Sequence, residues 1–179
     1  MRLSLVVFLM GTGTAIGQQN LNLEMLKKDT QIFENIVAEV LKQNFTHPFA
    51  IQAGPLAAYL QGYGVSVSFH LRINRLKIRT PFGEVENPTG GSTRSKREQL
   101  QTVKDSMIGV LADYGSAIKQ ISGHDRISIS AHVEDRYEID PTRNQTVMVF
   151  TVTKDNIDLY NMKRIPFEAF RERVMITEY

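Results

Sequence analysis

The chain has 179 residues, of which 42% are hydrophobic and 22% charged, a composition typical of one soluble globular domain with a sizeable core. Lys and Arg total 21 against 19 for Asp and Glu, so no strong basic field favours nucleic acid or anionic lipid as a partner. The absence of cysteine excludes disulfides, thiol nucleophiles and cysteine metal sites.

Residues 1–17 have the order of a secretory signal peptide. Arg2 precedes the apolar run of residues 3–10, and Ala15 and Gly17 are small residues placed for cleavage before Gln18. We therefore expect cleavage near Gly17, export to the periplasm or the extracellular space, and a single domain over residues 18–179. No later run approaches the length of a membrane span, so no transmembrane segment is expected in the mature chain.

Two other interpretations of the N-terminal segment compete with export. The apolar run is compatible with a buried strand. A dinucleotide-binding loop over residues 11–17 fits less well, because its third glycine comes one position late and no second strand ending in an acidic residue follows at the expected distance. Export accounts best for the basic start, the apolar middle and the small-residue exit together.

Apolar spacing predicts an amphipathic helix over residues 22–43, with Asn20 or Asn22 as its cap and Pro48 beyond its end. A strand is expected over residues 51–61. Gly62 and Gly64 can take the positive φ that a turn into the next strand requires. The buried stripe of this helix is expected to contain Leu26, Phe33, Ile36, Val37, Val40 and Leu41.

Strict alternation of apolar and polar residues predicts a strand over residues 65–78, with one face in a core and the other in water. The apolar face would contain Val65, Val67, Phe69, Leu71 and Ile73. The polar face would contain Ser66, Ser68, His70, Arg72 and Asn74. Residues 82–93 are rich in Gly, Pro and Asn and predict a loop.

The longest predicted helix follows this loop and runs to about residue 121, where Ser122 and Gly123 would close it. Ser95 and Glu98 fit a capping box at its start. Its apolar stripe recurs at spacings of three and four: Leu100, Val103, Met107, Val110 or Leu111, Tyr114, Ile118 and Ile121.

The last third of the chain predicts two strands, two short helices and a final strand. Residues 126–134 alternate, with Ser128, Ser130, His132 and Glu134 on the polar face. Residues 146–152 are apolar on both faces, which suits a central strand. Short helices are expected over residues 155–162 and from Pro166 to about residue 173, and a strand over residues 174–179.

This order of elements predicts an α+β fold. We expect a two-layer sandwich, in which a mainly antiparallel sheet of four to five strands is backed by two long amphipathic helices. The polar faces of the alternating strands would then look outward or towards a partner.

Several short blocks resemble a group of uncharacterised exported bacterial proteins. The first is Tyr59-Leu60-Gln61-Gly62-Tyr63-Gly64, a Y-L-[EQ]-G-[YF]-G strand-turn block followed by alternating apolar residues. The others lie at residues 111–115, 125–133 and 155–171. Since the group has no known activity, the resemblance implies export and a single domain and transfers no catalytic residue.

His70, His132 and Glu134 form the best candidate constellation for chemistry. No G-x-S-x-G pattern is present, and no two of the four histidines have the close spacing typical of metal ligands. His70 and His132 lie on the polar faces of two predicted strands, and Glu134 shares the face of His132. The three side chains would converge if those strands were neighbours. We expect no metal or cofactor.

The loop over residues 90–97 is a second candidate site. Free N–H groups, the positive end of a helix and several cations can hold phosphate, sulfate or carboxylate, although the P-loop spacing is missing. Tyr59 and Tyr63, beside the glycine turn, can form a binding edge. The loop residues concerned are Gly90, Gly91, Ser92, Arg94 and Lys96.

Because no catalytic pattern stands out, the sequence predicts an exported soluble domain with a non-catalytic binding or structural role. Its partner would be a protein or a small anionic ligand, and nucleic acid is not expected. One alternative is a small hydrolase or metal-dependent enzyme that uses His70, His132 and Glu134. A further alternative is an anion-binding module at the loop of residues 90–97.

Overall fold

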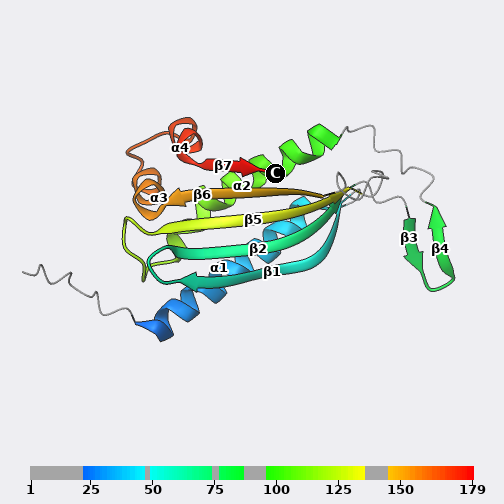
Figure 1. Ribbon diagram of the computed structural model, residues 1–179, viewed down its shortest axis with the longest axis horizontal. Coiled ribbons are helices and arrows are strands. Elements are labelled where there is room, and N and C mark those ends of the chain that lie inside the picture. Colours follow the sequence, from blue (N-terminus) through cyan, green and yellow to red (C-terminus); the bar gives the residue numbers. More distant parts are fainter. Residues whose placement is uncertain (1–21, 47–48, 74–76, 87–95, 136–144) are drawn as a thin grey trace, which may run out of the picture.

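The computed structural model describes residues 22–46, 49–73, 77–86, 96–135 and 145–179. Five strands form one mixed sheet in the order β1-β2-β5-β6-β7, and the helices lie on one side of it (Figure 1). The predicted α+β two-layer arrangement is therefore confirmed. The predicted signal peptide and the loop residues 90–95 lie outside the described ranges.

The elements follow in the order α1 (Leu23–Asn44), β1 (Ala50–Leu60), β2 (Gly64–Ile73), β3 (Lys77–Thr80), β4 (Gly83–Glu86), α2 (Lys96–Tyr114), the short 3₁₀ helix η1 (Gly115–Ala117), β5 (Arg126–Asp135), β6 (Gln145–Thr153), α3 (Lys154–Asn161), α4 (Phe167–Arg173) and β7 (Met175–Glu178). The pairs β1–β2, β5–β6 and β6–β7 are antiparallel, whereas β2 and β5 run parallel. Parallel neighbours need a crossover connection, and α2 lies within it.

Helix α1 begins where predicted, because the Asn22 side chain accepts a hydrogen bond from the N–H of Met25 at 3.1 Å. Its apolar stripe packs under the sheet and is buried at Leu26, Phe33, Val37 and Leu41. Burying one such side chain contributes roughly 1.5–3 kcal/mol, so this stripe anchors the helix to the sheet.

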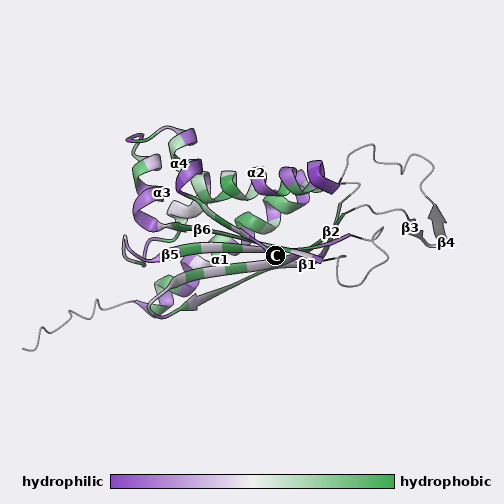
Figure 2. Ribbon diagram, turned by 45° about the horizontal axis from the view of Figure 1, so that its top comes forward, coloured by the Kyte–Doolittle hydropathy of each residue, from purple (hydrophilic) through white to green (hydrophobic). Residues whose placement is uncertain are grey.

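The alternation predicted for β2 and β5 is confirmed by burial. One face of each strand builds the core, and Figure 2 shows hydrophobic and hydrophilic residues alternating along β5. The core residues from these two strands are Val65, Val67, Phe69, Leu71, Ile73, Ile127, Ile129, Ala131 and Val133. Strand β6 lies between β5 and β7, as its apolar sequence predicted.

The edge strand β1 is protected against further pairing. Glu34 on α1 accepts a hydrogen bond from the N–H of Ala57 at 2.9 Å, and Pro55 has no N–H to offer. The register of β1 against β2 also shifts between Ile51 and Leu56, which breaks the regular edge.

Strand β2 is shorter than predicted, and a hairpin strand occupies the start of the expected loop, of which residues 87–93 lie outside the described residues. It ends at Ile73 rather than residue 78, and β3 and β4 pair with each other in a separate two-stranded sheet. Gly83, with φ of 121°, follows the two residues that connect these strands. Alternation alone does not mark where a strand leaves its sheet, which explains the error.

Helix α2 is also shorter than predicted, ending at Tyr114 rather than near residue 121. Gly115 packs so closely on α3 that a Cβ there would lie 2.7 Å from Cδ1 of Ile157. Ile118 is still fully buried, but it follows η1 in an extended conformation. Tyr114, predicted in the apolar stripe, is 42% exposed. No helix in the described part of the chain is long and apolar enough to cross a membrane.

Candidate functional site

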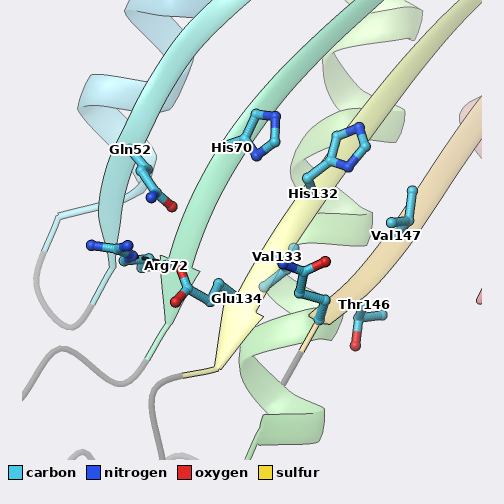
Figure 3. Close-up of a pocket in the computed structure, with 9 residues that line it drawn as sticks. Gln52, His70, Arg72, His132, Val133, Glu134, Thr146 and Val147 are labelled. Carbon is cyan, nitrogen blue, oxygen red and sulfur yellow. Dashed lines mark hydrogen bonds and ion pairs between the residues drawn. The ribbon is translucent and has the colours of Figure 1, made fainter. Parts of the chain in front are cut away.

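The side of the sheet that faces away from the helices forms a surface that we call the open face (Figures 1 and 3). Residues that alternate with the core residues on β2 and β5 point to it, and the register aligns them in rows across the strands. The open face includes Ser66, Ser68, His70 and Arg72 on β2, Ser130, His132 and Glu134 on β5, and Gln145, Val147 and Val149 on β6, whereas Ser128, which shares this side of β5, is buried.

His70 and His132 stack on each other at the centre of the candidate site. They occupy matching positions on β2 and β5, which stay in step over ten consecutive residue pairs. Their ring centroids are 4.6 Å apart and the ring planes differ by 12°. The sequence placed both residues on polar strand faces, and the parallel pairing supplies the contact that it left conditional.

Two residues further along each strand, in the next row of the open face, Arg72 and Glu134 form an ion pair. Nε of Arg72 donates to Oε2 of Glu134 at 2.5 Å, and the two side chains are 28% and 29% exposed. Charge-assisted contacts of this kind are short and orient both groups. The pair therefore fixes two side chains beside the stacked rings and adds no net charge.

A cavity of about 300 Å³ opens beside these four side chains. Residues from the neighbouring strands β1, β2, β5 and β6 line it, and Figure 3 shows His70, His132 and Glu134 projecting from the sheet on the side opposite the helices. Convergence of polar groups from separate strands on one concave site is typical of ligand pockets. The lining residues are Gln52, His70, Arg72, His132, Val133, Glu134, Gln145, Thr146 and Val147.

The surroundings of His132 disfavour its protonated form. Burial lowers the pKa of His132, and the neighbouring charge of His70 lowers it further. Both effects disfavour the protonated ring, so His132 is neutral at pH 7. In the described part of the chain neither imidazole hydrogen-bonds a serine or a carboxylate, which a general base in a triad would need.

The geometry offers little to a metal ion. Among the described residues, no group of three or more His, Asp or Glu side chains is arranged to hold one. The Glu134 carboxylate is engaged by Arg72, and nearly parallel rings direct their nitrogen lone pairs side by side rather than towards one point. A metal-dependent enzyme at His70, His132 and Glu134 would require these contacts to rearrange, and that hypothesis stays untested.

The other predicted site residues lie apart from this pocket. Tyr59 lines a separate groove of about 450 Å³ between α1 and β1. The guanidinium of Arg126 lies over the ring of Tyr63, with its Cζ 5.8 Å from the ring centroid. Nζ of Lys96 is 3.7 Å from Oδ2 of Asp135. The remaining loop candidates, Gly90, Gly91, Ser92 and Arg94, fall outside the described residues.

The sequence did not single out Gln52, Arg72, Gln145 or Thr146 as site residues. Arg72 was visible as one of several polar-face residues, but its partner Glu134 is 62 positions away in the chain. Only the pairing of β2 with β5 brings opposite charges to the same row. The usable clue was the shared two-residue spacing of His70 to Arg72 and His132 to Glu134.

Comparisons with protein-family models, with curated proteins and with solved structures found no match.

Proposed function

We propose that the protein is an exported, non-catalytic binding module whose ligand site is the His70–His132 pocket. The observation that carries the proposal is the convergence of polar side chains from four neighbouring strands on a cavity of about 300 Å³. Such a volume suits a small polar ligand or one end of a larger partner. The core lies on the other side of the sheet, so the open face can serve a ligand without disturbing it.

Binding accounts for the site better than catalysis does. A nucleophile requires a base within hydrogen-bond reach, and the nearest serines in the register, Ser68 and Ser130, have no such bond to either imidazole in the described structure. The stacked rings and the Arg72–Glu134 pair supply hydrogen-bonding groups in fixed positions instead. Fixed polar groups around a small cavity favour recognition.

Export is proposed from the order of residues 1–17 and from the resemblance of residues 59–64 to exported bacterial proteins. Expression of the full chain in a bacterial host, followed by fractionation and intact mass measurement, tests this location. We expect the exported form to begin at Gln18. Recovery of the uncleaved chain in the cytoplasm would contradict export.

A ligand screen read out by NMR tests the binding site. The purified protein would be titrated with small anionic and neutral polar compounds while the imidazole resonances of all histidines are followed. A ligand of the pocket should move the resonances of His70 and His132 and leave His124, whose side chain is 97% exposed, unchanged. Its affinity should fall in H70Q and H132Q but not in the matched control H124Q. Ligands that bind without moving His70 and His132 would contradict the proposal.

A further inference from the structure

The charges around the stacked imidazoles cancel while both rings are neutral. Arg72 on β2 and Glu134 on β5 are the charged residues of the pocket lining, and they pair with each other. The lining contributed by β1 and β6 is uncharged: Gln52, Gln145, Thr146 and Val147. Tyr179, which directly follows β7, pairs with Val147 through two backbone hydrogen bonds, so the titratable group next along the row is its phenol. Among the described residues that line the pocket, the net charge is therefore set by His70 and His132.

Protonation would change what the rings offer to a ligand. A neutral imidazole has one N–H donor and one acceptor nitrogen, whereas the protonated ring has two donors. Figure 3 shows the two rings in similar orientations, with their nitrogens towards corresponding edges. At a centroid separation of 4.6 Å one ligand can reach both rings. The terminal N–H groups of Arg72, whose Nε is held by Glu134, add further donors.

We propose that the ligand presents an oxyanion, namely a carboxylate, phosphate or sulfate group, and that its binding is coupled to protonation of His70 and His132. This proposal rests on the function proposed for the pocket. Two positive rings this close repel each other, and an anion that contacts both relieves that repulsion. Anion binding and protonation then favour each other, as linkage requires. The pocket would therefore bind an oxyanion more tightly in acid than near neutral pH.

The lowered pKa of His132 agrees with anion binding that strengthens as the pH falls. Its burial, and secondarily the charge of His70, lower the pKa of its imidazole. His132 therefore favours its neutral form at pH 7 and gains its positive charge on the acid side.

Sulfate is the appropriate probe, because its charge stays constant over the pH range in which histidine titrates. Its dissociation constant would be measured by NMR of the histidine resonances at pH 7.5 and pH 5.0, with ionic strength held constant by chloride. Because affinity gains about tenfold per pH unit for each proton taken up, we expect at least tenfold tighter binding at pH 5.0. Equal affinity at the two pH values would overturn the proposal.

Substitutions separate an anion site from a cation site. E134Q removes the negative charge beside the rings, so it should tighten sulfate binding, whereas it would weaken the binding of a metal ion. H70Q and H132Q should each reduce the pH dependence, and the exposed control H124Q should retain it. Amide NMR spectra would establish that each variant is folded before its affinity is compared.

The outcomes distinguish this inference from the function on which it rests. If a neutral compound moves the His70 and His132 resonances and sulfate does not, the pocket is a ligand site but the oxyanion proposal is wrong. If neither sulfate nor any compound of the screen reaches these residues at either pH, both fail.

Discussion

Gly64, at the start of β2, offers the sharpest test of how the two halves of the sheet meet. Its φ of 126° lies in a region that L residues rarely adopt. A Cβ at this position would lie 2.0 Å from the carbonyl oxygen of Arg126, the first residue of β5. The substitution Gly64→Ala therefore combines backbone strain with a clash against backbone atoms, which cannot rotate away.

The expected loss of stability follows from these two effects. An unfavourable φ costs an L residue about 1–3 kcal/mol. Backbone displacement by an overpacked atom adds about 1–3 kcal/mol. The Arg126 N–H also donates to the carbonyl of Tyr63 at 2.7 Å, so the displacement disturbs this contact too. We expect Gly64→Ala to lower the free energy of unfolding by about 2–6 kcal/mol, out of the roughly 5–15 kcal/mol of a typical domain.

Urea denaturation of three alanine variants would test this reasoning. At Gly62, with φ of 77°, a Cβ meets no atom within 4 Å, so Gly62→Ala should lose only about 1–2 kcal/mol through strain. Gly109, inside α2, also has free space, and Gly109→Ala should gain about 0.5–1 kcal/mol of helix stability. If Gly64→Ala loses no more than Gly62→Ala, the close approach to β5 does not constrain the fold and the reasoning is refuted.

Three further changes test other contacts. Lys163 has φ of 56° just after α3, where glycine is favoured, so Lys163→Gly should raise the free energy of unfolding by about 0.5–1 kcal/mol in urea titrations; a loss would contradict this. Glu34→Ala leaves the N–H of Ala57 without its acceptor and should cost about 1–3 kcal/mol in the same assay, whereas Glu34→Gln, which keeps an acceptor, should cost less. Because burial lowers the pKa of His132 in the folded state, with the charge of His70 as the second cause, the unfolded chain binds the extra proton and stability falls as pH drops below the ordinary histidine pKa of about 6.5. His132→Gln should flatten that slope in a series of denaturation curves between pH 7.5 and pH 5, and an unchanged slope would assign the titration to another group.

The strands were predictable because a period of two depends only on neighbouring residues. The alternation that ends at Ile73, and the one that begins at Ile127, each specified which side chains would face water. The partner of each strand was not specified, since pairing across the chain depends on how α2 crosses the sheet. The convergence of His70 and His132 could therefore be stated only as a condition.

The end of α2 shows why apolar spacing alone does not define a helix. Ile118 and Ile121 continue the three-and-four spacing and are both buried, yet they follow η1 outside the helix. An extended segment can bury the same residues when it runs along the core. Directly after the helix ends, Gly115 packs closely on Ile157, a residue 42 positions later in the chain (157 − 115), and such a contact has no local signature.

The parallel pairing of β2 with β5 couples the stability of the fold to the proposed site. In the main sheet as described, it alone links β1 and β2 to the β5, β6 and β7 group. A slip of one residue would turn the face of His132 and Glu134 towards the helices and bring Val133 to the open face, which the core disfavours. The apolar face therefore holds the register that stacks the two imidazoles. A ligand that contacts both rings would bridge the same two strands, and because it binds only the folded chain, it would raise the melting temperature as its concentration increases.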